Sequence, residues 1–227
     1  MGRTRASRGA GHKHRILIVD DHPIVRDGLT GLINQQDDMA VCATGANTAE
    51  ATSEALRTKP DCAIVDLSLG GDSGFTFIKD VKHRLPEMRI VVLTMHDDPM
   101  YVRRALEAGA SGYVTKQDST SVIPDAIRRV LDGEAYVTEH LSRLLLGNMA
   151  SLYRFGKSAG TDLLSSREFE VFSLLGQGLS PRQIAEQLHR SVRTIEAHRE
   201  NIKRKLGLRT ATEVAQRAAI VARESSS

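Results

Sequence analysis

Short apolar runs alternate with amphipathic stretches over the first 130 residues of the chain. The apolar runs predict strands at 15–19, 39–43, 62–66, 89–93 and 112–115. The amphipathic stretches between and after them predict helices at 23–34, 48–58, 75–83, 100–108 and 121–131. Continuous apolar runs suit strands that are buried on both faces, and strands that alternate with helices form parallel, right-handed units. The pattern therefore predicts a doubly wound α/β domain with a five-stranded parallel sheet.

From residue 163 onward the strand signals stop and helix-start signals take their place. Ser165 and Glu168 have the spacing of a capping box, and Ser180 with Pro181 has the residue types of a second helix start. Ser191 is a third N-cap, after a tight turn at 189–190. We expect helices after each of these caps, the third over 192–206 and a fourth over 211–222. This part of the chain is predicted to be all-α.

The helix over 192–206 has two contrasting faces. At about 100° per residue, Ile195, Ile202 and Leu206 share one stripe. The opposite face carries Arg193, Ala197, Glu200 and Arg204. Two short helices joined by a tight turn, the second with a partly basic outer face, are typical of a DNA-binding helix-turn-helix. A solvated surface helix is the alternative.

Charge and composition divide the chain into parts. The 227-residue sequence begins with a basic stretch, expected to be a flexible tail over 1–14. Acidic residues dominate in 16–140 and basic residues in 162–227, so we expect two domains, 15–133 and 162–227, joined by a linker over 134–161. The sequence contains no run of 18 apolar residues, so no membrane-spanning helix is expected. Cys42 and Cys62 lie in predicted strands, and we expect both to be small hydrophobic residues of the core. Two free thiols are typical of a cytoplasmic protein.

Polar residues follow four of the predicted strands. Asp20 and Asp21 follow the first, Asp66 ends the third, Thr94 follows the fourth and Lys116 follows the fifth. The carboxyl ends of the strands in an open parallel sheet share one crevice, where ligands bind. Three carboxylates, a hydroxyl and an ammonium group at one point suit a divalent cation and one transferable phosphoryl group.

Two sets of residues resemble known families. Asp20–Asp21, Asp66, Thr94, Tyr113 and Lys116 resemble the flavodoxin-like receiver domain of two-component response regulators. A second set resembles the LuxR-type helix-turn-helix: Leu164–Ser165, Arg167–Glu168, Gly178, Ser180, Ile184–Ala185, Thr194–Ile195–Glu196, His198 and Lys205–Leu206–Gly207. Together, over residues 15–217, the sequence resembles the NarL/FixJ subfamily, so 15–133 would be the receiver and 162–227 the DNA-binding domain.

The resemblance implies a role for each matched residue. Asp66 would accept a phosphoryl group from a sensor histidine kinase, and Asp20, Asp21, Asp66 and the backbone carbonyl of Ser68 would hold Mg²⁺. Thr94 and Lys116 would bind phosphoryl oxygens, and Tyr113 with Thr94 would form the switch. The implied function is a phosphorylation-regulated transcription regulator that binds double-stranded DNA as a homodimer.

The predicted reading helix carries two kinds of candidate DNA contact. Carboxylates can accept from cytosine and alanine can meet a thymine methyl group, whereas phosphate contacts position without specifying. We expect base-edge contacts from Arg193, Glu196, Ala197 and Glu200. We expect phosphate contacts from Thr194, Arg199, Lys203 and Lys205.

Two positions depart from the receiver pattern. Gly70 lies four residues after Asp66, and Gln117 follows Lys116, where the family usually has proline. Glycine predicts a more mobile loop. A cis bond before Gln117 would cost about 2.5–4 kcal/mol, against roughly 0.5–1 kcal/mol before proline. We therefore expect the Lys116 loop to lie differently or to carry strain.

Two other functions compete with the phosphorylation switch. The first is a phosphorylation-independent DNA-binding regulator with a degenerate receiver, which Gly70 and Gln117 mildly favour. The second is an enzyme, such as a haloacid-dehalogenase-like phosphatase, which needs a second aspartate two residues after its nucleophile. Ser68 occupies that position here, so we expect that the protein is not an enzyme.

Overall fold

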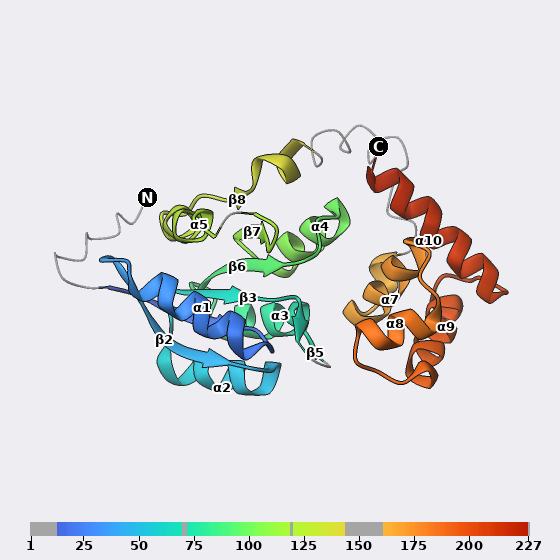
Figure 1. Ribbon diagram of the computed structural model, residues 1–227, viewed down its shortest axis with the longest axis horizontal. Helices are drawn as coiled ribbons and strands as arrows, with labels where there is room; N and C mark the ends of the chain where they lie inside the picture. The colour runs from blue at the N-terminus through green and yellow to red at the C-terminus, as the bar shows by residue number, and fades with distance from the viewer. Residues whose placement is uncertain (1–12, 70–71, 119, 144–160, 227) are drawn as a thin grey trace.

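The computed structural model describes residues 13–69, 72–118, 120–143 and 161–226 (Figure 1). Residues 1–12 of the predicted tail, most of the predicted linker, and Gly70 lie outside the described residues. Among the described residues, no helix is long and apolar enough to cross a membrane.

A parallel sheet forms the centre of the N-terminal domain. Its strand order is β2-β1-β3-β6-β7-β8, and every pair in it is parallel. The bounds are β1 His14–Val19, β2 Met39–Gly45, β3 Cys62–Val65, β6 Arg89–Thr94, β7 Gly112–Thr115 and β8 Tyr136–Val137. Two further strands, β4 Ser68–Leu69 and β5 Asp72–Ser73, form a small antiparallel pair after β3.

The sheet has one strand more than the sequence predicts. β8 lies in the predicted linker and pairs with β7, with Tyr136 beside Gly112 and Val137 beside Tyr113. A two-residue strand has no apolar run of its own, so periodicity cannot reveal it. The predicted doubly wound parallel fold is otherwise confirmed.

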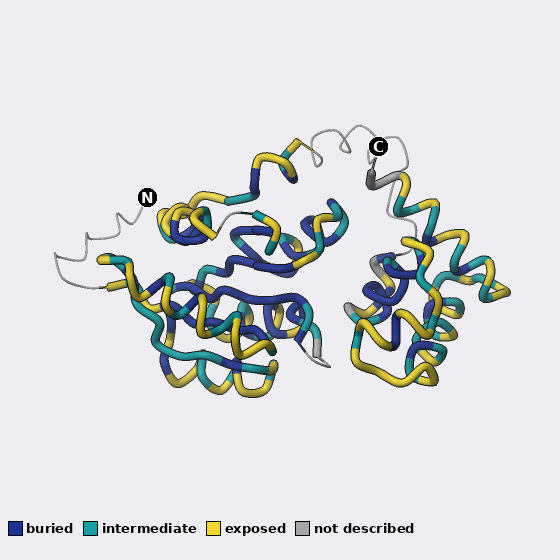
Figure 2. Tube along the Cα trace, viewed as in Figure 1, coloured by how far each residue is buried: buried dark blue, intermediate teal, exposed yellow. Residues whose placement is uncertain are grey.

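Helices cover both faces of the sheet (Figure 1). α2 Thr48–Thr58, α3 Gly74–Arg84 and α4 Pro99–Ala108 pack on one face, and α1 Pro23–Asn34 and α5 Val122–Leu131 pack on the other. Every central strand is buried on both sides, as Figure 2 shows by the dark blue of the sheet. This arrangement brings all the parallel strands to one carboxyl edge.

The C-terminal domain is helical, as predicted. It consists of a 3₁₀ turn Thr161–Leu163 and helices α7 Ser166–Gly176, α8 Pro181–Gln187, α9 Val192–Lys205 and α10 Ala211–Ser226. Helix α10 is four residues longer than the sequence predicts. Capping boxes begin α7 and α8, and Ser191 caps α9 by accepting from the Thr194 amide at 3.1 Å. The turn between α8 and α9 uses His189 at φ 50°, a left-handed conformation that allows the tight reversal.

Candidate functional site

Asp20, Asp66 and Lys116 meet at the carboxyl edge of the sheet. Asp20 follows β1, Asp66 follows β3 and Lys116 follows β7. The Lys116 Nζ donates to Asp20 Oδ2 at 2.7 Å and also to Asp66 Oδ2. Both carboxylates are buried, with 2% and 5% of their surface exposed. One ammonium group therefore bridges two buried carboxylates that come from different strands.

Asp21 lies beside this pair and contacts a residue that the sequence reasoning missed. The His22 Nδ1 lies 2.7 Å from Asp21 Oδ1 and 3.3 Å from Asp20 Oδ1. Asp20, Asp21 and His22 offer ligand atoms that all lie within 4.8 Å of one another. The position of His22, directly after the aspartate pair, is the signal that could have identified it. The group has the donor types of a cation site.

Burial and charge oppose each other at the bridge. Burial raises the pKa of Asp66 above its usual value, while Lys116 acts in the other direction and Asp20 adds to the increase. Burial disfavours the charged form of Lys116, but Asp66 and Asp20 outweigh it and raise the Lys116 pKa. One ammonium thus leaves negative charge in the crevice incompletely compensated, and a divalent cation would favour the charged carboxylates.

Ser68 and Thr94 lie at the carboxyl ends of neighbouring strands, β3 and β6. The Ser68 amide donates to Asp66 Oδ1 at 3.0 Å, which fixes the carboxylate at the end of β3. Thr94 is fully buried, and its Oγ1 accepts from the His96 amide at 3.5 Å. Tyr113 is also fully buried, and its hydroxyl donates to the His96 carbonyl at 2.8 Å. Thr94 and Tyr113 therefore both contact the backbone of His96, which sequence reasoning did not select.

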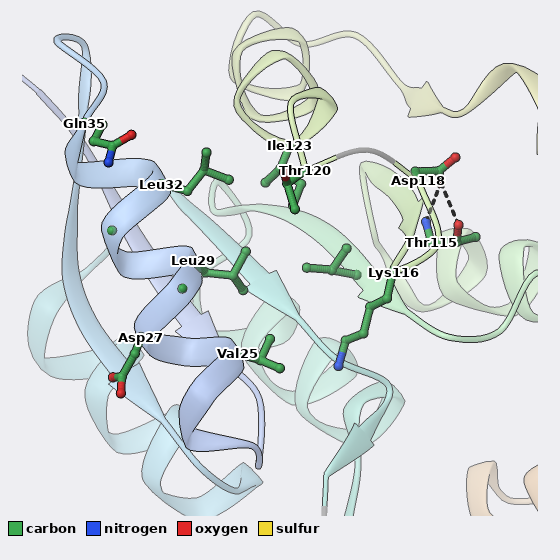
Figure 3. Close-up of a pocket in the computed structure, with 13 residues that line it drawn as sticks. Val25, Asp27, Leu29, Leu32, Gln35, Thr115, Lys116, Asp118, Thr120 and Ile123 are labelled. Atoms are coloured by element: carbon green, nitrogen blue, oxygen red, sulfur yellow. Dashed lines mark hydrogen bonds between the residues drawn. The ribbon is translucent and has the colours of Figure 1, made fainter.

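The loop after Lys116 is held without the proline of the family pattern. The Asp118 Oδ2 accepts from the Thr115 amide at 2.8 Å and from its hydroxyl at 2.7 Å (Figure 3). The Lys116 amide donates to the Thr94 carbonyl at 2.7 Å. All described peptide bonds are trans, including the one before Gln117. Hydrogen bonds at Asp118 thus supply an anchor where the sequence suggested displacement or strain.

A hollow of about 580 Å³ opens between α1 and α5 and extends to Lys116 (Figure 3). Apolar side chains such as Leu29, Leu32 and Ile123 line much of it. Gly28 and Gly31 contribute no side chain on the α1 side. Lys116 is therefore the residue that the hollow shares with the carboxylate bridge.

The outer face of α9 is exposed, and two of its acidic residues are paired within the helix. Arg193, Ala197, Glu200 and Arg204 are exposed, whereas Ile195 and Ile202 are fully buried. The Glu196 carboxylate lies 2.8 Å from Arg199 Nη2, and the Glu200 carboxylate lies 2.7 Å from Lys203 Nζ. These pairs lie on the surface, where they are worth little and can exchange partners.

Two residues expected at DNA phosphates also have hydrogen-bond partners within the domain. The Lys205 Nζ donates to Glu168 Oε2 at 2.6 Å and thus ties α9 to α7. The Thr194 hydroxyl lies 2.8 Å from the hydroxyl of Ser191, the N-cap of α9. The remaining candidates, Arg199 and Lys203, are half-buried.

Comparisons with known proteins match both parts of the chain. Residues 16–128 match the family described as the response regulator receiver domain, and residues 162–218 match the bacterial regulatory proteins of the luxR family. The oxygen regulatory protein NreC of Staphylococcus aureus (strain JH9) is 38% identical over 206 residues, which cover 89% of this chain and 95% of NreC.

Solved structures of response regulators match most or part of the chain. RcsB from Salmonella enterica serovar Typhimurium, bound to promoter P1flhDC in the presence of the phosphomimetic BeF₃⁻, matches with a TM-score of 0.58 and 29% identity. The match covers 91% of this chain and 98% of that one. A LuxR-family two-component response regulator from Aurantimonas sp. SI85-9A1 matches with a TM-score of 0.59 and 34% identity, over 61% of this chain and 99% of that one.

Receiver domains generally bind Mg²⁺ at their phosphorylation site and imply a histidine kinase partner, and a LuxR-type helix-turn-helix implies DNA. The members of this family are regulators of transcription and not enzymes. The strand-end carboxylates, the bridging lysine and the capped three-helix motif all agree with these matches. The chain belongs to the NarL/FixJ-type response regulators, the phosphorylation-regulated DNA-binding transcription regulators of two-component systems.

Proposed function

We propose that Asp66 is the phosphoacceptor of this response regulator. The bridge from Lys116 to both Asp66 and Asp20 carries this proposal. It holds one carboxylate oxygen at the mouth of the crevice, next to a positive charge that can contact the incoming phosphoryl oxygens. In the transfer, the phosphorus–nitrogen bond of a kinase phosphohistidine breaks as a phosphorus–oxygen bond to Asp66 forms.

Mg²⁺ would be held by Asp20, Asp21, Asp66 and the backbone carbonyl of Ser68. The donor set fits because Mg²⁺ prefers oxygen ligands and keeps waters and phosphate oxygens in its remaining positions. Bound there, it would neutralise charge on the phosphoryl group. Burial raises the pKa of Asp66 and Asp20 adds to the increase, so a cation held beside these carboxylates would favour their charged forms.

Thr94 and Tyr113 would change position when the phosphoryl group binds and so transmit its presence to the rest of the receiver. The Thr94 hydroxyl, which accepts from the His96 amide, would turn to donate to a phosphoryl oxygen, because a charged oxygen is a strong acceptor. The Tyr113 hydroxyl donates to the carbonyl of His96, the residue whose amide contacts Thr94. A movement of Thr94 would therefore be transmitted to Tyr113 through the backbone of His96. A switch of this kind requires that the phosphoryl group interact differently with two states of the protein.

The helix α9 would read DNA in the major groove, and the protein would bind as a homodimer in the cytoplasm. Arg193, Glu196, Ala197 and Glu200 would lie near base edges, and Arg199 and Lys203 near phosphates, positioned by the buried stripe beneath them. The hydrogen bonds of Thr194 and Lys205 within the domain favour a supporting role for those two residues. We also propose the domain limits 15–133 and 162–227, with a linker between them whose β8 pairs with the receiver sheet.

Intact mass after incubation with an acyl phosphodonor and Mg²⁺ tests this function. The chain should gain one acid-labile phosphoryl group, and Asp66→Asn or an excess of chelator should abolish the gain. Asp80→Asn is the matched control, because Asp80 pairs with Arg84 on the surface of α3. Labelling that persists in a folded Asp66→Asn variant would refute the assignment of the acceptor.

A further inference from the structure

The helix α7 of the DNA-binding domain is docked on α4 of the receiver. The Phe169 ring lies 5.0 Å from the Tyr101 ring between centroids, and the Arg104 guanidinium carbon lies 4.1 Å from the Phe169 ring centroid. The Arg104 Nη2 donates to the Leu164 carbonyl at 3.0 Å. Tyr101 and Phe169 are both buried. The two domains therefore share an apolar contact with a cation over one ring.

A polar connection extends from this contact to the carboxylate of Asp66. The Ser68 hydroxyl donates to Glu170 Oε1 on α7 at 3.3 Å, and the Ser68 amide donates to Asp66 Oδ1 at 3.0 Å. The Ser68 Oγ also lies 3.5 Å from His96 Nε2, and the His96 ring stacks on Tyr101 with centroids 4.0 Å apart. One residue of the receiver thus contacts both the candidate phosphoacceptor and the other domain.

Glu170 is held in this position by its own helix. Its Oε2 accepts from Arg167 Nη1, and the carboxylate is buried, with 5% of its surface exposed. A carboxylate that is buried near Asp66 is sensitive to any charge that is added there, because the surrounding medium screens it little. The interaction between these two acidic groups is repulsive.

This docked arrangement leaves the predicted reading face of α9 open. Arg193, Ala197, Glu200 and Arg204 are exposed while α7 contacts α4. The contact uses Phe169 and Glu170 in the first two turns of α7, and α9 lies farther from the receiver than α7 and α8 (Figure 1). The docking of α7 on α4 therefore leaves the DNA-reading residues exposed, and its direct contacts are with the receiver.

We propose that Glu170 is a positioning residue of the phosphorylation site and couples the occupancy of Asp66 to the docking of the DNA-binding domain. This inference rests on Asp66 as the phosphoacceptor. In the docked state Glu170 orients the Ser68 hydroxyl at the mouth of the crevice. Phosphoryl oxygens at Asp66 place further negative charge beside the Glu170 carboxylate, so α7 leaves α4 more readily. Because coupling between two binding events is reciprocal, docking in turn weakens the binding of a phosphoryl group.

Amide hydrogen exchange of the full-length chain tests this coupling. The chain is held in saturating Mg²⁺ and titrated with beryllofluoride, a stable mimic of the phosphoryl group. In the parent chain, exchange in α4 and α7 should accelerate as beryllofluoride binds. Glu170→Gln keeps the shape and an acceptor for Ser68 but removes the charge. It should reduce this acceleration and lower the beryllofluoride midpoint about fivefold, at the low end of typical coupling between sites.

Two variants separate coupling from simple damage to α7. Glu186→Gln makes the same chemical change on an exposed part of α8, where Glu186 pairs with Arg182, and should respond like the parent. Ser68→Ala breaks the connection from the receiver side, leaves the Arg167–Glu170 pair intact and keeps the Ser68 backbone carbonyl. Its effect should not add to that of Glu170→Gln in the double variant, because the two changes act on the same contact: one removes the Ser68 hydroxyl and the other removes the charge of the group that accepts from it.

The outcomes distinguish this proposal from the assignment of the acceptor. A Glu170→Gln chain with the parent midpoint and the parent response in α7 would overturn the coupling, as would additive effects in the double variant. A change in basal exchange alone, with the response preserved, would mean that Glu170 is only structural, which also overturns it. A beryllofluoride response that survives in Asp66→Asn would instead refute Asp66 as the acceptor.

Discussion

Gly74 packs its α-carbon directly against the backbone carbonyl of Asp66. A Cβ atom at position 74 would overlap the Asp66 carbonyl oxygen and would lie 2.8 Å from the Leu67 Cα. The Gly74 amide also donates to the Leu67 carbonyl at 2.9 Å, which closes the turn from β3 into α3. The absence of a side chain at the start of α3 is therefore what allows Asp66 to lie at the crevice.

Gly74→Ala should destabilise the receiver and impair phosphorylation together. The new methyl group meets backbone atoms that cannot move independently, so we expect a loss of about 1–3 kcal/mol in the free energy of unfolding. Urea denaturation measures the stability, and phosphodonor labelling measures the site. Gly28→Ala is the matched control, because Gly28 lies inside α1 with no atom within 4 Å of its added Cβ. It should stabilise the chain by about 0.5–1 kcal/mol; equal effects of the two changes would contradict this account.

Lys116→Gln should make the stability of the protein more dependent on Mg²⁺. The change leaves Asp20 and Asp66 buried without the ammonium that bridges them, so the free energy of unfolding in chelator should fall by about 3–5 kcal/mol. Mg²⁺ then supplies the missing charge, and the rise in Tm upon adding it should exceed that of the parent chain. Thermal melts with chelator and with a Mg²⁺ series measure both quantities. A smaller Mg²⁺ response in the variant would show that Lys116 does not compete with the cation.

Lys203→Ala and Glu196→Ala should affect DNA binding in different ways. A lost phosphate contact should weaken binding to specific and random DNA about equally and reduce the salt slope by roughly 1. A lost base contact should change sequence preference, with about 1–3 kcal/mol at stake. Fluorescence anisotropy at several salt concentrations measures both. Arg143→Ala, which removes an exposed cation from the residues after β8, is the control; parent-like binding by both α9 variants would exclude this helix as the reader.

Cys62 should resist alkylation in the folded protein, whereas Cys42 should react. Burial raises the pKa of Cys62 to about 12, so roughly one thiol in ten thousand is ionised at pH 8. Cys42 is half-buried. Intact mass after iodoacetamide treatment should show one adduct in the native state and two in denaturant. In Cys42→Ser the native chain should gain none; a native adduct there would mean that β3 opens more readily than its burial indicates.

The elements with long, uniform patterns were predictable from the sequence. β3 and the last four residues of β1 are continuous apolar runs, and the caps at Ser165, Ser180 and Ser191 all begin helices within one residue of the expected position. β8 was not predictable, because its two residues are recruited by pairing with β7 rather than by a pattern of their own. Local sequence therefore determined those elements that bury a full face or carry a complete cap.

Part of the candidate site could likewise be predicted from the sequence, and part could not. Asp20, Asp66 and Lys116 could be placed together because each follows a parallel strand, and parallel strands end at one edge. The contact between Ser68 and Glu170 spans 102 residues and depends on how two domains dock, which no local signal records. His96 lies two residues after Thr94, and only the structure brings its ring onto Tyr101.

The pairing of β8 with β7 also determines how far the DNA-binding domain can travel. β8 and the helical residues 139–143 after it bind the chain to the edge of the sheet, so the tether to residue 161 starts there and not at the end of α5. Residues 144–160 can span at most about 60 Å even when fully extended. An undocked DNA-binding domain therefore remains at a high effective concentration near its own receiver. Redocking is then an intramolecular event, and its equilibrium does not depend on the concentration of the protein.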